Sequence, residues 1–463
     1  MEQNQGMLKK TGLYVLMAAL LLGTMWRGGY FTEPKLVLAS LLLLAGSWEI
    51  VTAVSLGERR ILRSPALWIF TVLTALATAS LFWNEAPGRA GLEAALMAGY
   101  LAALLVARSQ VLRSGGAAAG SLLRWLVYAA CFTAVWGIVA YLLRIYPYVV
   151  FVDHFLRAGS VFEYSNALSC FQLMALPVTL AFFLTAGKAD RPVFAAAAAL
   201  QIAAVALAFS RLGAAMLLVM LAFFLASAWR RGLAPETFLT MLAGLIMAAA
   251  ALAFGEAEQG EIGVAVVTLL TVSLYAGQAF AATAKGRPLF NRAFALFAVL
   301  GGLTAAVFFA ISHRTQVILS SRFIEGLSAD RLLPHRQVTW NSAWQAFMDR
   351  PAGGWGLGSF YEIFSRYQEA QFTRYAHNVV LQMAVDTGIV GAVLTALFLG
   401  YAAALGVWRL FGRFDLMGRA LAASALVFIV YNMFDWEWYI PALTAWFMVI
   451  VACLEAGERK SGT

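Results

Sequence analysis

The feature that most constrains this chain is a series of apolar runs, most of them long enough to cross a lipid bilayer as a helix. A membrane-spanning helix needs about 20 apolar residues, and hydrophobic residues make up 62% of the 463-residue chain. Read generously at their ends, the runs are residues 11–26, 36–54, 66–83, 91–107, 122–143, 166–186, 192–209, 212–229, 236–254, 262–284, 293–311, 378–407, 420–434 and 440–454. The sequence therefore predicts an all-α, polytopic helical membrane protein with about 14 (12–14) transmembrane helices.

The lysine and arginine residues predict the orientation of these helices. With a cytoplasmic N-terminus, 20 of the 33 basic residues fall on the cytoplasmic side and 13 on the other side, seven of these in one long loop. Positive charge holds short loops in the cytoplasm, whereas long loops cross largely regardless of charge. We therefore expect both termini in the cytoplasm, and the net charge of +9 reflects this topology. Charged residues make up only 12% of the chain, which excludes a cytosolic enzyme, a disordered chain and a nucleic-acid binder.

The long loop separates two groups of spans. We expect three regions: helices 1–11 in residues 1–311, a long external loop in residues 312–377, and helices 12–14 in residues 378–463. All seven basic residues of the loop are arginine. No strand stands out anywhere in the chain.

Within the loop, residues 334–349 predict a helix that starts at a proline and carries three aromatic side chains on one face. These are Trp340, Trp344 and Phe347. The stripe fits either a helix lying on the membrane surface or a helix that caps the bundle. A glycine-rich turn follows, and a second short helix is expected over residues 359–372.

His377 is the most informative position, because it stands where the long loop ends and a span begins. A histidine at a membrane edge has either a structural or a catalytic role. Asn378 could orient its ring or a substrate. Asp386 lies nine residues further on in an apolar stretch, where an ionisable group is costly unless it is paired or faces water. We take His377 as the catalytic candidate, with Asn378 and Asp386 as supporting or substrate-binding residues.

Two arginines are candidates for binding an anion. Arg211 lies between two apolar runs joined by almost no loop, either as an interface anchor or facing a cavity. Arg336 lies in the predicted loop helix, and a guanidinium can bind phosphate oxygens through two hydrogen bonds at once. Weaker candidates for substrate binding are Arg157 and Asn166 beside the sixth span, and Arg322 and Arg331 in the loop.

No metal site and no cofactor are predicted. The four histidines are scattered, and the three cysteines lie far apart within apolar runs. Neither set has the close ligand spacing of a zinc site.

Five motifs follow one another along the chain: RAGSVFEYSNA at 157–167, SRLG at 210–213, RQVTW at 336–340, PAGGWGLGSF at 351–360 and AHNVVLQMAVDTG at 376–388. Their order and placement resemble the O-antigen ligase and O-antigen polymerase superfamily of bacterial membrane glycosyltransferases. The nine residues between Asn378 and Gly388 match the spacing of the motif that such ligases carry. The chain departs from the family in a span count at its upper end, and in Asp386, where glutamate is common.

The resemblance implies a reaction and its substrates. The donor would be a glycan on undecaprenyl pyrophosphate, at the outer face of the bacterial cytoplasmic (inner) membrane. The glycan would pass to a hydroxyl acceptor with inversion and without a metal: another lipid-linked glycan, lipid A core or a protein side chain. Arg211 and Arg336 would bind the pyrophosphate, and the membrane bundle would offer a groove for the polyprenyl tail. His377 would take the proton of the acceptor hydroxyl or position the acceptor.

Several alternatives stay open at this point. A flippase for the same lipid-linked glycan would carry its charges near mid-membrane and often shows internal repeats, whereas here the charges gather at one edge. A cell-wall polymerase of the shape, elongation, division and sporulation type relies on a loop aspartate. A purely structural membrane protein would not explain why arginine and histidine residues gather on one side. The motifs do not separate polymerase, ligase and protein O-oligosaccharyltransferase, although the span count favours a polymerase.

Overall fold

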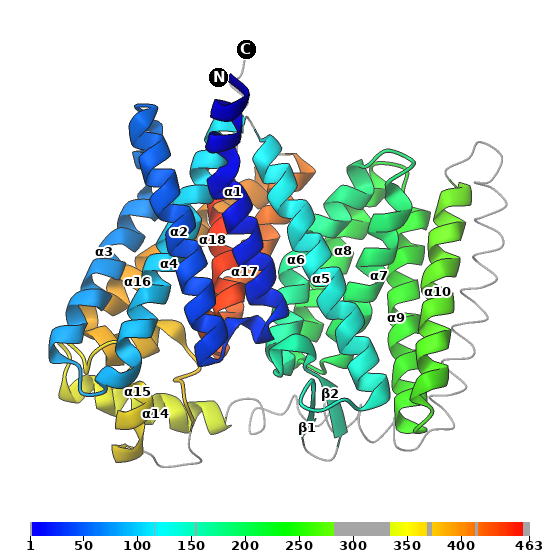
Figure 1. Ribbon diagram of the computed structural model, residues 1–463. Helices are drawn as coiled ribbons and strands as arrows, with labels where there is room; N and C mark the ends of the chain where they lie inside the picture. Colours follow the sequence, from blue (N-terminus) through cyan, green and yellow to red (C-terminus); the bar gives the residue numbers. More distant parts are fainter. Residues whose placement is uncertain are drawn as a thin grey trace. The chain divides into compact units, whose positions relative to one another are not determined.

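A computed structural model of the chain describes residues 2–114, 116–152, 155–281, 334–367, 373–412 and 415–456 (Figure 1). Contacts within the chain divide it into two compact units. The first comprises Met1–Trp125 and Leu333–Thr463, and the second comprises Leu126–Leu332. The helix α5 (Ala117–Leu143) crosses from the first unit into the second.

The first unit is a helical bundle in which α4 packs against α2 and α18, while α16 packs against α3 and α17. Besides the start of α5, its helices are α1 (Glu2–Met25), α2 (Thr32–Ser55), α3 (Pro65–Ala79), α4 (Pro87–Ser114), α14 (Pro334–Asp349), α15 (Phe360–Ile363), α16 (Val379–Phe411), α17 (Leu416–Phe434) and α18 (Pro441–Ala456). Short 3-10 turns connect them: η1 (Arg27–Gly29), η2 (Arg60–Leu62), η3 (Ser80–Trp83), η7 (Phe364–Arg366) and η8 (Glu437–Tyr439). Within this unit, α14 and α15 lie at the end away from the start of α1 (Figure 1).

The second unit is also helical, with α7 packed against α6, α9 and α10. After α5 it contains β1 (Val149–Val152), β2 (Phe155–Ala158), the 3-10 turn η4 (Ser160–Phe162), α6 (Ser165–Thr185), α7 (Arg191–Leu207), α8 (Arg211–Trp229), α9 (Ala234–Glu256) and α10 (Gly260–Ala281).

The predicted spans agree with the helices. Ten described helices are long and apolar enough to cross a membrane, and three shorter apolar helices cover Lys10–Met25, Arg191–Leu207 and Pro441–Ala456. Thirteen of the fourteen apolar runs therefore correspond to a helix, and the run at 293–311 lies outside the described residues. The prediction of an all-α polytopic membrane protein is confirmed.

Contacts at the helix ends match the predicted alternation of the spans. In the first unit the Trp83 indole donates to the Gly353 carbonyl, and Arg374 donates to the Tyr30 hydroxyl. Each bond joins two segments that the predicted topology places on the same side of the membrane. We call this side of the first unit the His377 end.

The expectation that no strand stands out is wrong for the segment between α5 and α6. β1 and β2 form an antiparallel hairpin in which Val149 pairs with Ala158 and Val152 with Phe155. The strands have only four residues each, too few for an alternating pattern to separate them from an apolar loop.

The long loop folds back onto α16 rather than standing free. The predicted helix over 334–349 is confirmed as α14, and of the expected helix over 359–372 only α15 and η7 form among the described residues. Phe347 is buried in a cluster with Trp355 and Phe364, whereas Trp344 is 55% exposed. The aromatic side chains of α14 therefore divide between the protein core and the surface, and α14 packs against α16. The predicted boundary at 311/312 lies outside the described residues.

At the opposite end of the first unit, buried charges connect α4 to α18. Arg108 donates to Glu455 at 2.8 Å and to the Ile61 and Arg63 carbonyls, and Tyr401 donates to the same carboxylate. The side chains of Arg108 and Glu455 are only 6% and 7% exposed.

Glu455→Ala is expected to destabilise the protein by about 3–5 kcal/mol, because it leaves the Arg108 charge buried without its partner. Glu258→Ala is the matched control, since it breaks an exposed pair with Arg144 and should cost about 1 kcal/mol or less. Thermal unfolding of the two purified variants measures the difference. Equal losses would show that the Arg108–Glu455 pair adds nothing beyond a surface ion pair.

Candidate active site

The side chains of His377, Arg336 and Asp435 meet at the His377 end of the first unit. Asp435 contacts both of the others. One Asp435 carboxylate oxygen lies 2.8 Å from His377 Nδ1, and the other accepts a hydrogen bond of 3.0 Å from Arg336 Nη2. Asp435 directly follows α17, and its side chain is only 3% exposed. Burial strengthens both charge-assisted bonds, so Asp435 fixes the histidine and the arginine relative to each other.

The carboxylate decides which nitrogen of His377 is available for chemistry. An ionised carboxylate only accepts hydrogen bonds, so Nδ1 carries the hydrogen and Nε2 is left as the proton acceptor. The Thr373 hydroxyl oxygen lies 3.3 Å from Nε2, which shows that a hydroxyl can approach this nitrogen. The ring is 21% exposed.

The backbone at His377 is also unusual. Its φ is +53°, in the left-handed region that non-glycine residues rarely adopt. The next residue, Asn378, caps α16, with its side chain accepting a hydrogen bond from the Leu381 amide and donating to the Met433 carbonyl. Asn378 thus holds the start of α16 against the end of α17, next to Asp435, and it accounts for the position of His377.

Arg336 retains donors after binding Asp435. Its Nε is buried and makes no hydrogen bond within the described part of the chain, and its side chain is 26% exposed. A guanidinium has five N–H donors. This side chain can therefore bind an anion while it stays paired with Asp435.

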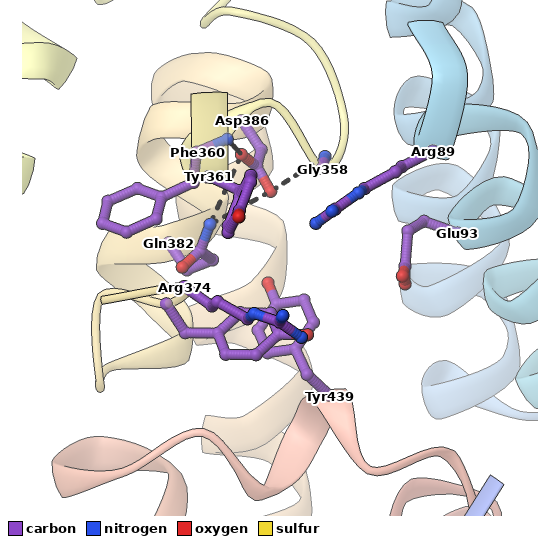
Figure 2. Close-up of a pocket in the computed structure, with 10 residues that line it drawn as sticks. Arg89, Glu93, Gly358, Phe360, Tyr361, Arg374, Gln382, Asp386 and Tyr439 are labelled. Atoms are coloured by element: carbon purple, nitrogen blue, oxygen red, sulfur yellow. Dashed lines mark hydrogen bonds between the residues drawn. The ribbon is translucent and has the colours of Figure 1, made fainter. Parts of the chain in front are cut away.

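Asp386 anchors the glycine-rich turn to α16. Its carboxylate accepts hydrogen bonds from the Gly358 and Phe360 amides and from the Gln382 side chain, drawn as dashed lines in Figure 2. Gly388 interrupts α16 with a non-helical backbone at φ +74°. A Cβ at this position would lie 2.2 Å from the Ala352 carbonyl oxygen. These bonds satisfy the buried carboxylate and place it in a supporting position.

Glu437 is a second buried carboxyl close to Asp435. It is fully buried, and neither carboxyl oxygen has a hydrogen-bond partner among the described residues. Burial raises the pKa of the Glu437 carboxyl well above its ordinary value of 4.5; the Asp435 charge raises it further, and Arg336 opposes both. Glu437 is therefore held as the neutral acid.

The raised pKa of Glu437 predicts a pH-dependent stability. The unfolded chain releases this proton near its ordinary pKa, whereas the folded protein keeps it. The stabilisation is therefore fully present below about pH 4.5 and is lost as the pH rises through the folded-state pKa. Glu437→Gln, which mimics the neutral acid, should remove this loss. The melting temperature of the variant should rise relative to that of the wild type as the pH increases above about 4.5. Parallel curves, like those expected for the exposed Glu258→Gln control, would contradict the assignment.

The second unit brings together the other predicted residues. Arg157 lies in β2 and is buried; it donates to the Ala208 carbonyl at 2.9 Å and to the Asn166 side chain at 3.0 Å. Ala208 belongs to the short connection between α7 and α8. Arg211 is the first residue of α8, whose N-cap Ser210 accepts a hydrogen bond from the Gly213 amide. The predicted Arg157–Asn166 cluster therefore supports the turn that carries Arg211.

This unit also contains an apolar pocket of about 250 Å³ between α5, α7 and α10. Ile138, Leu200 and Val267 lie in its wall, with Thr268 and Thr271 as its polar lining residues. Such a pocket suits a hydrocarbon chain.

Two residues of the predicted site, Arg322 and Arg331, lie outside the described residues. Sequence reasoning missed Asp435 and Glu437. Both follow directly after the run at 420–434 in the acidic and aromatic segment DWEWY, and acidic residues at the end of a span were a signal that could have found them. In the described ranges, no three His, Cys, Asp or Glu side chains are grouped to hold a metal ion.

The comparisons with known proteins address the family. Residues 259–396 match the family model described as O-antigen ligase. No curated protein matches the chain. The matched segment contains α14, the glycine-rich turn, His377 and the first half of α16. The match therefore confirms the resemblance to the O-antigen ligase family for residues 259–396, which hold three of the five motifs.

Proposed function

We propose that this chain is a membrane glycosyltransferase of the O-antigen polymerase or ligase type. It transfers a glycan from undecaprenyl pyrophosphate to a hydroxyl acceptor at the outer face of the bacterial cytoplasmic membrane. The observation that carries the proposal is the buried Asp435 carboxylate bound to both His377 and Arg336. This carboxylate holds a proton acceptor, His377, beside an anion-binding group, Arg336. Both of these residues lie in the segment that matches the O-antigen ligase family. The excess of positive charge in the short loops supports an outward-facing site and cytoplasmic termini.

In the proposed reaction, His377 Nε2 takes the proton of the acceptor hydroxyl while the hydroxyl oxygen bonds to the anomeric carbon. The bond from that carbon to the pyrophosphate oxygen breaks, and attack from the opposite face inverts the anomeric centre. Asp435 stabilises the imidazolium that forms, as a carboxylate does when it binds the other ring nitrogen of a general base. Undecaprenyl pyrophosphate leaves with the bonding electrons.

The leaving group determines what the arginines do. Negative charge develops on the pyrophosphate oxygens as the bond breaks, and fixed donors aimed at that charge lower the barrier. Arg336 supplies donors that remain after its bond to Asp435. The family resemblance implies that Arg211 also binds the pyrophosphate.

Arg336→Ala and Arg211→Lys are each expected to lower the transfer rate by about 10²–10³-fold, the usual cost of removing one donor to a developing charge. Lysine keeps the charge of Arg211 but not its two-pronged geometry. The measurement is single-turnover transfer by folded, purified variants, with Arg191→Lys as a control at an arginine outside the proposed site. Near-normal rates in both variants would refute the assignment.

The function itself is tested by incubating the purified protein, in the presence of EDTA, with one defined undecaprenyl-pyrophosphate oligosaccharide. A ladder of longer lipid-linked products, absent with His377→Ala, would establish a metal-independent polymerase. A new product that forms only when lipid A core is added would make the protein a ligase. A product that needs a protein acceptor would make it an O-oligosaccharyltransferase.

A flippase would give a different result in cells. Loss of the transferase strands lipid-linked glycan on the outer leaflet, whereas loss of a flippase strands it on the inner leaflet. Accumulation on the inner leaflet in a His377→Ala strain, with no product in vitro from the folded wild type, would overturn the proposed function.

A further inference from the structure

A small pocket at the His377 end of the first unit is not used by the reaction proposed above (Figure 2). Its lining comes from Arg89 and Glu93 on α4, Gly358, Phe360 and Tyr361 at the end of the glycine-rich turn and the start of α15, Arg374 and Tyr375 before α16, Gln382 and Asp386 on α16, and Tyr439 in η8. Parts of the chain that are distant in sequence thus converge on one cavity.

One polar group in this pocket has no partner. The Tyr439 hydroxyl is buried and makes no hydrogen bond within the described ranges, and the residue is only 8% exposed. Figure 2 shows the Tyr439 side chain extending from η8 into the pocket. Buried polar atoms almost always have a hydrogen-bond partner, so this hydroxyl is available to bond to a molecule in the pocket.

The charges around the pocket favour a neutral ligand. Arg89 lies near Glu362 at 3.9 Å, and the Glu93 carboxylate is paired with Lys35. The remaining formal charges, on Arg374 and Asp386, are opposite in sign. A cavity that offers both guanidinium donors and carboxylate acceptors suits a hydroxyl, which donates and accepts at once.

The pocket also has the size to hold one edge of a sugar. Its volume of about 30 Å³ holds only a few heavy atoms, such as two neighbouring hydroxyl groups. The Tyr375 ring stacks between Trp436 and Tyr439 at 5.1 and 4.4 Å, and the Arg89 guanidinium covers the Tyr361 ring at 4.2 Å. These contacts hold the aromatic side chains around the pocket in place.

The pocket borders the proposed reaction site. Tyr375 is two residues before His377, so the two Cα atoms are at most about 7 Å apart. Gln382, in the pocket wall, accepts a hydrogen bond of 2.7 Å from the amide of Ala376, the residue between them. The pocket wall and His377 are therefore neighbours along the chain, joined by one residue whose amide is held by Gln382.

From these observations we infer that the pocket between Arg89, Arg374 and Tyr439 binds the hydroxyl-bearing edge of a neutral pyranose, the terminal sugar of the acceptor. The assignment to the acceptor rests on the proposed function, because His377 is taken to act on the acceptor hydroxyl. The pocket then selects which sugar can enter and which of its hydroxyls faces the histidine.

Direct binding of simple glycosides tests this inference without any enzyme assay. The protein is placed in lipid nanodiscs prepared without sugar-based detergents. Saturation-transfer NMR then measures the binding of methyl β-D-glucopyranoside, methyl β-D-galactopyranoside and methyl β-D-glucuronide. We expect at least one neutral glycoside to bind. Tyr439→Phe should weaken that binding about three- to ten-fold, the effect of one hydrogen bond.

Two further variants sharpen the test. Arg89→Met keeps an apolar side chain over Tyr361 but removes the guanidinium donors, and together with Tyr439→Phe it should reduce binding below detection. Tyr401→Phe is the matched control, since it removes a tyrosine hydroxyl that binds Glu455 at the other end of the unit; its binding should equal that of the wild type. Melting temperatures confirm that each variant is folded.

Two results would overturn the inference. The first is no binding by either neutral glycoside, or binding that Tyr439→Phe and Arg89→Met leave unchanged. The second is binding by the glucuronide alone, which would replace the neutral class with an acidic sugar. Failure of the proposed function is seen separately: glycoside binding that depends on Tyr439, in a protein without transferase activity, would retain the sugar site and reject the reaction.

Discussion

His377→Ala is expected to lower the transfer rate by about 10²–10⁴-fold, the usual contribution of a general base. The variant loses the only ring nitrogen in the proposed mechanism that takes the acceptor proton. Because the side chain is partly exposed and contacts few groups, the protein should remain folded. The measurement is the single-turnover rate on a defined undecaprenyl-pyrophosphate oligosaccharide, with melting temperature as the check on folding.

His377→Gln separates two roles for this residue. Glutamine keeps a hydrogen-bond donor and acceptor but cannot hold the proton of the acceptor hydroxyl. A loss equal to that of the alanine variant would assign His377 as the base, whereas substantial remaining activity would assign it to positioning the acceptor. Arg191→Lys, outside the proposed site, is the control for the rate. Asn378→Ala removes a helix cap and should cost about 0.5–2 kcal/mol of stability.

Asp435→Asn is expected to reduce the transfer rate by about 10²–10⁴-fold, because the change acts on His377 and Arg336 together. Asparagine has the shape of aspartate but no negative charge, so it neither selects the His377 tautomer nor holds the guanidinium. Asp435 touches no reacting atom in the proposed mechanism and is a positioning residue.

A double variant distinguishes this role from a general structural one. If Asp435 acts through His377, adding Asp435→Asn to His377→Ala should lower the rate by much less than it does in the wild type. Glu437→Gln is the matched control, since it makes the same acid-to-amide change at another buried carboxyl group two residues away and should leave the rate nearly unchanged. Full additivity of the two losses would contradict the coupling of Asp435 to His377.

Much of the fold was predictable because each membrane helix carries its own signal. An apolar run of sufficient length requires a helix, since the bilayer offers no partners for backbone groups. This holds for α2, α4 and α16 irrespective of what they pack against. The hairpin of β1 and β2 was not predictable, since four residues in each strand are too few to show an alternating pattern.

The site was predictable only in part. Residues that are near one another in the sequence could be grouped, whereas partners distant in the sequence could not. His377, Asn378 and Asp386 belong to one continuous motif, so their order along the start of α16 follows directly from the sequence. Arg157 and Asn166 were grouped as neighbours in sequence, and a hydrogen bond joins them. Asp435 was missed because it lies 58 residues from His377 and 99 from Arg336, and no local pattern marks such a pairing.

The sequence by itself determined the class of the protein, the number of its apolar runs and the residues capable of proton transfer and phosphate binding. These properties depend on composition and on spacing within one segment, which the chain carries before it folds. Only the tertiary structure decided that Asp435 joins His377 to Arg336, that Asp386 anchors a glycine-rich turn, and that Tyr439 enters a pocket with Arg89. Each of these arrangements depends on how separate helices pack, and packing is set by the combined shape of many distant side chains rather than by any one stretch of sequence.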